Sequence, residues 1–376
     1  MATHILTVNE DTFKVHLKYM FIGTGRNNFA HQNGALADIL GIREGDNIIF
    51  YVMNVGFFGI FKAKGNVFYE SHTNQYLNTE LNSKTLTYRM MIEPQDVYSN
   101  YISEWDMMEN PENIKDKSIY NMQWNWIFKK LNANRGCLSI DEIEFNLFKN
   151  ILIQNNTKLN NVLNYSFNNK AICELNNNTI FYNGNTSILP RIEVNLVKIN
   201  IEEDLRILFC AKANNNAILN QVLKPSINGN ITFISNEAIC SFSERKIDLL
   251  LGTDRDKCLL IELKNDFIFN DSIYNQLKEY SRWISSYKKK YTEIVPILIL
   301  KMPRTLAPSK GCKFYKYLSV DAQNNNLTSD WYSEIIQKIN EARENLINES
   351  IQNVSELQVY VFSVDANNNL LNFDIL

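Results

Sequence analysis

The chain of 376 residues is longer than one hydrophobic core usually organises, so we expect two domains. Hydrophobic residues make up 45% of it, aromatic residues 12% and charged residues 21%, which excludes a disordered chain. Its 38 basic and 41 acidic side chains nearly balance, so any nucleic-acid surface must come from local clustering of positive charge.

Six cysteines are scattered without a CxxC pair or neighbouring histidines, which argues against a zinc site or a disulfide framework. The N-terminal segment has no basic region followed by an apolar core, and no later apolar run reaches the length of a membrane span. We therefore expect a soluble, cytoplasmic protein with reduced thiols and no membrane partner.

The first third of the chain, to about residue 135, alternates short β-type runs with turn signals, which predicts a compact β barrel with helices. Strands are expected at 48–52 and 56–63, and a helix at 34–40 should end at Gly41, a residue suited to helix C-termini. Apolar residues at helical spacing predict a further helix over 140–155. We expect this helix to close the first domain.

From residue 201 the pattern changes to helix, strands, helix and strand, which predicts an α/β core with a central mixed sheet. An apolar stripe at steps of three and four marks the helix over 272–287. The expected order ends with a helix at 330–348 and a hairpin around 366–368. We therefore place the domains at 1–155 and 196–376, joined by an Asn-rich connector at 156–195.

The segment RKIDLLLGTDRDKCLLIELK holds two apolar runs around a turn, which predicts an antiparallel hairpin. If the turn is centred on Arg255, Asp248 and Glu262 face one another, with Cβ atoms about 5 Å apart. Because side chains alternate along a strand, Lys264 shares the face of Glu262. Three charged groups therefore converge on one side of the hairpin.

Two adjacent buried carboxylates are costly unless a cation compensates them. Mg²⁺ is the expected ion, with Mn²⁺ as a substitute, because it prefers carboxylate oxygens and commonly bridges to phosphate. Lys264 would orient or activate the attacking water and offset charge on the phosphorus centre. The alternative is structural: Lys264 forms salt bridges to Glu262 and Asp248 in a solvated sheet.

The set of Asp248 followed by Glu262-Leu263-Lys264 resembles the PD-(D/E)xK nuclease superfamily, without its preceding proline. The resemblance covers about residues 200 to 300 and is to a subgroup related to restriction and repair endonucleases. It implies a metal-dependent phosphodiester hydrolase in which Asp248 and Glu262 hold the metal ion and Lys264 is catalytic.

The same resemblance extends to a helix acid, most plausibly Glu202, and to Gln276 with Tyr280 in the following helix. It implies that the acid assists the metal site and that the glutamine lies near the catalytic lysine. Sequence alone does not separate Glu202 from Glu203, and both acids and Gln276 have a simpler interpretation as solvated helix residues. Two basic residues of the second helix are candidates for neutralising phosphates: Lys278 and Arg282.

Residues 21–70 resemble EVE and other PUA-like domains, with a polar loop, a short helix, a Gly-Asp turn and a Gly-aromatic strand. The resemblance implies a small barrel that binds nucleic acid, in several cases around a modified base. Such a barrel needs aromatic walls for stacking and amides to read the base edge. The candidates are Phe57, Trp105, Trp124 and Trp126 for the walls and Asn27 and Asn28 for the reading groups. The alternative is that the aromatic side chains belong to the core.

Together these features predict an endonuclease for double-stranded DNA, in restriction or host defence, whose N-terminal domain selects the DNA and whose second domain cuts it. A double-strand cut by such a centre calls for a homodimer or two successive events. Two alternatives stay open: a non-catalytic nucleic-acid reader with a degenerate nuclease scaffold, and a repair or RNA-directed nuclease.

Overall fold

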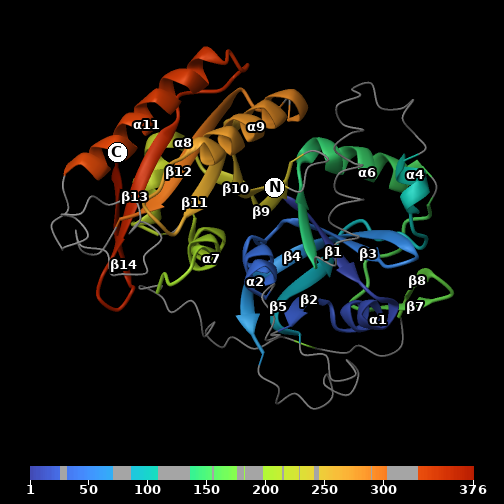
Figure 1. Cartoon of the computed structure of the whole chain (residues 1–376). Helices are drawn as coiled ribbons and strands as arrows, with labels where there is room; N and C mark the ends of the chain where they lie inside the picture. The colour runs from blue at the N-terminus through green and yellow to red at the C-terminus, as the bar shows by residue number, and fades with distance from the viewer. Residues whose placement is uncertain are drawn as a thin grey trace. The chain divides into compact units, whose positions relative to one another are not determined.

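The computed structural model describes residues 1–25, 32–70, 86–108, 136–154, 156–175, 182, 198–213, 216–227, 229–240, 245–288, 290–302 and 329–376. Contacts divide the chain into two compact units, which Figure 1 colours mainly blue to green and yellow to red. Unit 1 comprises Met1–Glu193 and Phe233–Glu244, and unit 2 comprises Val194–Thr232 and Arg245–Leu376. The expected functional labels of the two domains stay predictions.

Unit 1 holds most of the strands and helices of the first half of the chain. In order these are β1 (Thr3–Val8), α1 (Glu10–Tyr19), β2 (Phe21–Gly25), α2 (Gln32–Leu40), β3 (Asn47–Val52), β4 (Gly56–Tyr69), β5 (Leu86–Pro94), α4 (Glu104–Met108), β6 (Cys137–Ile140), α6 (Glu142–Gln154), β7 (Tyr165–Asn168) and β8 (Ala171–Glu174).

Six of these strands form one sheet in the order β2-β5-β4-β3-β1-β6. Within the described part of the chain β2 and β6 are its two edges, so the sheet is open there and the predicted barrel is not confirmed. The predicted strands at 48–52 and 56–63 and helices at 34–40 and 140–155 are confirmed as β3, β4, α2 and α6. The expected connector contains the hairpin β7–β8, which packs against α1 through Phe167 and Phe13.

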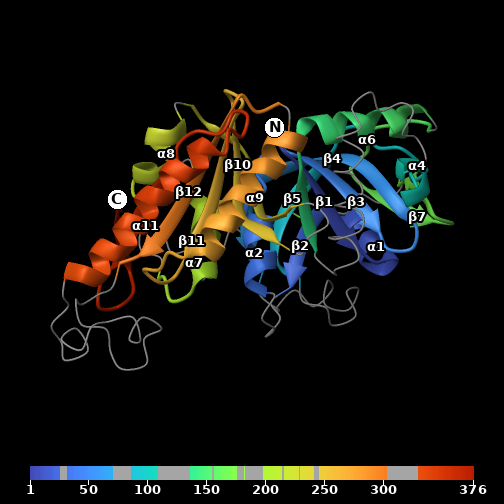
Figure 2. The ribbon, with the colours of Figure 1, turned by 45° about the horizontal axis from the view of Figure 1, so that its top comes forward.

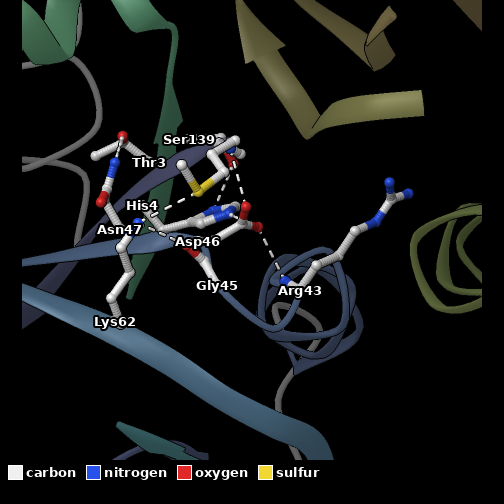
Figure 3. Close-up of polar contacts among 10 residues, drawn as sticks. Thr3, His4, Arg43, Gly45, Asp46, Asn47, Lys62 and Ser139 are labelled. Carbon is white, nitrogen blue, oxygen red and sulfur yellow. Dashed lines mark hydrogen bonds and ion pairs between the residues drawn. The ribbon is translucent and has the colours of Figure 1, made fainter. Parts of the chain in front are cut away.

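A buried polar cluster holds β1 between its neighbours β3 and β6 (Figure 3). His4, which is 0% exposed, shares hydrogen bonds of 3.1 Å with Asp46 through Nε2 and with Ser139 through Nδ1. The Asp46 carboxylate also accepts from the backbone N–H groups of Ala2 and Arg43, both at 2.9 Å. One carboxylate therefore satisfies donors from β1 and from the turn that precedes β3.

Unit 2 carries the remaining elements, although β9 begins there and continues into residues that cluster with unit 1. In order they are α7 (Glu202–Lys212), α8 (Leu219–Ile227), β9 (Ile231–Ile239), β10 (Lys246–Thr253), β11 (Lys257–Lys264), α9 (Asp271–Tyr287), β12 (Glu293–Lys301), α11 (Ser329–Asn348), β13 (Gln358–Val364) and β14 (Leu370–Ile375).

The second sheet has the order β14-β13-β12-β11-β10-β9 and is mixed, as predicted. β11 pairs antiparallel with β10 and parallel with β12, so the β10–β11 hairpin lies inside the sheet. β11 is nearly continuously buried, because an interior strand covered on both faces buries consecutive side chains. This position makes any charged side chain near its end expensive to desolvate.

Helices cover both faces of this sheet, with α9 and α11 together on one face and α8 on the other (Figures 1 and 2). The side chain of Asn270 caps α9 by accepting from the N–H of Ile273 at 3.1 Å. The predicted apolar stripe of α9 is confirmed, since Ile273, Leu277, Tyr280 and Ile284 are buried. None of the described helices combines the length and hydrophobicity that a membrane span requires.

Replacing Asp46 by alanine should lower the free energy of unfolding by about 3 kcal/mol, because it leaves buried donors without a partner. Burial alone would raise the pKa of Asp46, but His4 and the N–H donors hold it below its usual value of 3.8. The stability contributed by the ionised carboxylate is therefore present above that pH and is lost as the pH falls below it. Urea denaturation measures both effects.

The control is Glu93→Gln, which removes an exposed ion pair with Lys64 and should change the unfolding free energy by less than about 1 kcal/mol. Equal stability of Asp46→Ala and the wild-type protein would contradict the structural role of this carboxylate.

Candidate active site

The β10–β11 hairpin has the register predicted from its sequence. Leu249 pairs with Ile261 and Leu250 with Leu260, so the residue numbers of each pair sum as expected for a turn centred on Arg255. The next pair in this register is Asp248 with Glu262. Direct cross-strand partners project from the same face, so the hairpin sets these two carboxylates side by side.

At the start of β10 and the end of β11, hydrogen bonds from side chains replace the backbone hydrogen bonds of the hairpin. The N–H of Leu263 donates to Oδ2 of Asp248 at 2.8 Å, and the hydroxyl of Tyr280 donates to the carbonyl of Lys246 at 2.9 Å. β10 is thus tied to β11 by the Asp248 carboxylate and to α9 by a tyrosine. These bonds fix the position of Asp248 relative to Glu262.

Glu262 is 3% exposed, and its two oxygens have different surroundings. Oε1 accepts from the ammonium of Lys264 at 2.5 Å, whereas Oε2 is buried and has no hydrogen-bond partner among the described residues. A buried carboxylate oxygen without a partner is costly, and such atoms are uncommon in folded proteins. The oxygen is therefore available to a cation.

The charges of this cluster perturb one another. Burial, and then repulsion from Asp248, raises the pKa of Glu262 to about 8, against an opposing effect of Lys264. The same two causes raise the pKa of Glu202, in the first turn of α7, to about 7. Burial alone would lower the pKa of Lys264, but the three carboxylates together raise it. Two carboxyl groups thus titrate near neutral pH, as is common at functional sites.

The structure brings Glu202 rather than Glu203 into this cluster. Glu203 lies 3.3 Å from Arg206, whose side chain is itself nearly buried. Arg206 also helps to lower the pKa of Glu202, although it was not among the predicted site residues. Arg206 follows Glu202 by four residues, and this spacing puts both side chains on one face of the helix. That spacing was the sequence signal that could have indicated Arg206.

The donor set fits a divalent cation held by two carboxylates, because Asp248 and Glu262 are adjacent and Oε2 of Glu262 lacks a hydrogen bond. Within the described segments no group of three or more His, Cys, Asp or Glu side chains is arranged to hold a metal ion. This does not conflict with magnesium, which is commonly held by one or two carboxylates together with water and phosphate. The described cysteines, from Cys137 to Cys258, form no disulfide bond with one another.

The predicted residues of α9 divide between two flanks of the helix. Gln276 is half-buried and lies one turn before Tyr280, on the flank that reaches β10. Lys278 is two positions further on, about 200° around the helix, and shares its stripe with Arg282. Both of these basic side chains form ion pairs with the carboxylate of Glu349, just beyond α11. They therefore clamp the end of α11 to α9, which weakens the prediction that they neutralise phosphates.

The predicted base-reading residues of unit 1 have contrasting positions. Phe57 is fully buried and packs against Tyr51 and Phe148, so its ring is occupied by core contacts. Trp105, on α4, is 68% exposed and so retains a free face for stacking. The other four candidates lie outside the described residues: Asn27, Asn28, Trp124 and Trp126.

The linked side chains of Ser139, His4 and Asp46 have the order of a hydrolytic triad (Figure 3). The imidazole is fully buried between paired strands, however, and Ser139 is the direct cross-strand partner of His4. A general base must reach the proton that it removes from a bound substrate. The arrangement is therefore explained by strand pairing.

Comparisons with known proteins do not assign this chain to a family. No family model matches it, and no curated protein matches it. It is similar to the solved structure of protein Atu2648 from Agrobacterium tumefaciens, with 12% identity, a TM-score of 0.28 and coverage of 40% of this chain and 93% of that one. It is also similar to SfsA of Pyrococcus furiosus in complex with Ca²⁺, with 12% identity, a TM-score of 0.22 and coverage of 42% and 59%. At such TM-scores no function follows from either likeness.

The affinity for Mg²⁺ should fall as the pH is lowered through the Glu262 pKa of about 8, because a protonated carboxyl must lose its proton before it binds metal. One proton gives a loss of about tenfold in affinity per pH unit below that pKa. Isothermal titration calorimetry at several pH values measures this dependence. The Glu262→Gln variant should bind Mg²⁺ weakly, and its affinity should not depend on pH in this way. A wild-type affinity for Mg²⁺ that is constant across the pH range would exclude Glu262 as a ligand.

Proposed function

We propose that unit 2 hydrolyses phosphodiester bonds of DNA with the help of magnesium. One observation carries the proposal: a buried Glu262, with an oxygen lacking a hydrogen bond, lies beside Asp248 and is bonded to Lys264. A purely structural acid–lysine pair would not require a second carboxylate on the same face of the hairpin. The expectation of a PD-(D/E)xK arrangement from the sequence agrees with this geometry.

Each side chain has a chemical task in the proposed reaction. Asp248 and Glu262 would hold magnesium, which when bound lowers the pKa of a coordinated water and polarises the phosphoryl oxygen. The Lys264 ammonium would donate to the attacking water or to a phosphate oxygen as negative charge builds there. Glu202, with a pKa of about 7, could exchange a proton close to neutral pH.

We further propose that unit 1 selects the DNA, by a modified base where one is present, and that the setting is restriction or host defence. Support comes from the PUA-like order of residues 21–70 and from the exposed Trp105. Cutting both strands would use a homodimer or two successive events. Cleavage assays with RNA and with damaged DNA as substrates distinguish this proposal from the alternative of a repair or RNA-directed nuclease.

Asp248→Asn, Glu262→Gln and Lys264→Met should each lower the rate of DNA cleavage at least about a hundredfold, because each removes a metal ligand or a charge-stabilising donor. Conversion of supercoiled plasmid in Mg²⁺ measures the rate, with metal chelation as the negative control.

Lys257→Gln and Glu293→Gln are matched controls. Lys257 and Glu293 form a 2.6 Å ion pair where β11 and β12 begin, at the end of these strands away from Glu262 and Lys264. Each variant therefore changes one charge in the same strands. Both should cut at close to the wild-type rate. Absence of cleavage by the wild-type protein on modified and unmodified plasmid and on RNA would refute the proposed chemistry.

Trp105→Ala should weaken DNA binding by about 1 to 3 kcal/mol if its exposed ring stacks on a base. Leu163→Ala is the control, because Leu163 is another exposed hydrophobic residue of unit 1 without a ring to stack. Fluorescence anisotropy with methylated and unmethylated duplexes measures both affinity and preference. Identical affinities of Trp105→Ala and the wild-type protein would remove this residue from the reading surface.

The second candidate function is a nucleic-acid reader whose nuclease-like unit has no activity. It is favoured by the ion pair of Lys264 with Glu262, which a structural acid–lysine pair would also form. Binding of DNA by the wild-type protein with no cleavage in Mg²⁺ or Mn²⁺, and no calorimetric uptake of either ion, would support the reader over the nuclease.

A further inference from the structure

The sheet of unit 1 carries a buried arginine, Arg89, on β5 between the strands β2 and β4. The direct cross-strand partners of Arg89 are Gly23 on β2 and Phe68 on β4, and such partners project from the same face of a sheet. A Cβ atom on Gly23 would lie 3.3 Å from Cγ of Arg89, so glycine leaves room for the arginine side chain beside β2. The guanidinium lies over the ring of Phe21, 4.9 Å from its centre.

Three rings and a carboxylate surround the same space as this arginine. The rings are those of Phe21 on β2, Phe68 on β4 and Tyr19 at the end of α1. The carboxylate of Glu70, just after β4, lies 4.0 Å from Arg89, and both charged side chains are 4% exposed. Apolar residues of similar volume are often at least as stabilising as a buried ion pair, so stability alone does not require these charges. We call these five residues the aromatic box.

The side chain inside the aromatic box is that of Tyr182. Its ring centre lies 5.4 Å from that of Phe21 and 6.5 Å from that of Phe68. Its hydroxyl accepts a hydrogen bond from Nη1 of Arg89 and donates one to Oε2 of Glu70, both at 2.8 Å. Burial raises the pKa of Tyr182, so the hydroxyl stays protonated and can donate. The box therefore surrounds a flat ring and pairs with an acceptor and a donor at its tip.

Tyr182 differs from the residues of the box in its origin. The strands that carry the box are held together by backbone pairing of β2 with β5 and of β5 with β4. Tyr182 belongs to no helix or strand, and it lies 93 residues from Arg89 and 112 from Glu70 along the chain. Loss of its ring from the box would leave the pairing of these strands in place. Tyr182 is thus an occupant of the box and not part of its frame.

A nucleobase has the same chemical features as this occupant. It is a flat ring whose Watson–Crick edge carries a hydrogen-bond acceptor next to a donor, and proteins bind an extruded base by stacking and by hydrogen bonds to that edge. Arg89 would donate to the acceptor and Glu70 would accept from the donor, as both do with the hydroxyl of Tyr182. The exposed Trp105 lies on α4 and is not one of the residues of the box.

We propose that the aromatic box binds a base extruded from the nucleic acid, and that Tyr182 occupies the box until a base displaces it. This inference rests on the proposed function for its ligand class. It adds a regulation of DNA selection by unit 1. Only molecules with a vacant box can take up the base, so Tyr182 lowers the apparent affinity for DNA.

The test compares Tyr182→Phe and Tyr182→Ala with the wild-type protein by fluorescence anisotropy of a DNA duplex in EDTA. The duplex carries one mismatched pair, because a mismatched base is extruded at lower cost. Tyr182→Phe keeps the ring but loses both hydrogen bonds of the hydroxyl, so Kd should fall about tenfold. Tyr182→Ala also loses the ring, so its Kd should fall at least as far. Adding Arg89→Met to Tyr182→Phe should abolish the gain, because the box then lacks its donor.

Tyr165→Phe is the matched control. It removes the hydroxyl of another buried tyrosine of unit 1, which donates to the carbonyl of Asn160 at 2.8 Å, and its Kd should equal that of the wild-type protein. Thermal denaturation checks that each variant folds, and Tyr182→Phe decides alone if Tyr182→Ala does not fold. An unchanged or higher Kd in the folded Tyr182 variants would overturn the inference, because Tyr182 would then only anchor its segment to the sheet.

Free nucleosides separate this inference from the proposed function. In equilibrium dialysis, at least one of deoxyadenosine, deoxycytidine, deoxyguanosine and thymidine should bind the folded Tyr182 variants about tenfold more tightly than the wild-type protein. Such binding in a protein that neither binds nor cuts DNA would mean that only the proposed function is wrong. A wild-type protein that cuts DNA in Mg²⁺, together with Tyr182 variants that gain affinity for neither DNA nor a nucleoside, would mean that only the role of the box and Tyr182 is wrong.

Discussion

The register of the β10–β11 hairpin is the constraint on which the candidate site depends. Backbone pairing of Leu249 with Ile261 sets the register, and its continuation places Asp248 opposite Glu262. The interior position of the hairpin then buries Glu262 and leaves Asp248 half-buried. Burial, and then repulsion from Asp248, raises the pKa of Glu262, so the folded protein binds a proton more tightly at this site than the unfolded chain.

This difference in proton binding has a thermodynamic cost. A carboxyl pKa that is raised on folding, from the usual 4.5 to about 8 for Glu262, makes the folded state less stable as the pH rises through that window. A bound divalent cation would reverse the effect, because it favours the ionised form. The site is thus unfavourable for stability by itself, which is a common property of sites preorganised for a ligand.

The parts of the fold that follow from local pattern could be predicted from the sequence. The apolar runs on either side of Arg255 determine the hairpin, and the stripe of Ile273, Leu277 and Ile284 determines α9. Contacts between distant segments could not be predicted. The pairing of Lys278 with Glu349 joins a residue of α9 to one just beyond α11, and no periodicity of α9 indicates it.

The roles of individual site residues depend on what surrounds each side chain in the folded protein. The pattern favoured Glu202 over Glu203 as the helix acid without settling the choice, and the surroundings of the two side chains in the structure distinguish them. The core position was the favoured alternative for Phe57 from the sequence, and the structure confirms it. Unit 1 shows a mixed α/β architecture with an open sheet among its described strands, which neither the turn signals nor the composition specified.

The connectivity of the second sheet also has a kinetic consequence. β10 and β11 are joined by a short turn and can pair within microseconds, whereas β12 reaches β11 only through the crossover helix α9. Asp248 and Glu262 should therefore meet early in folding, while the hairpin is still hydrated and the ions repel weakly. The full repulsion would develop late, when α9 packs on β11 and β12, so docking of this helix is the step at which proton binding by Glu262 would enter the folding reaction.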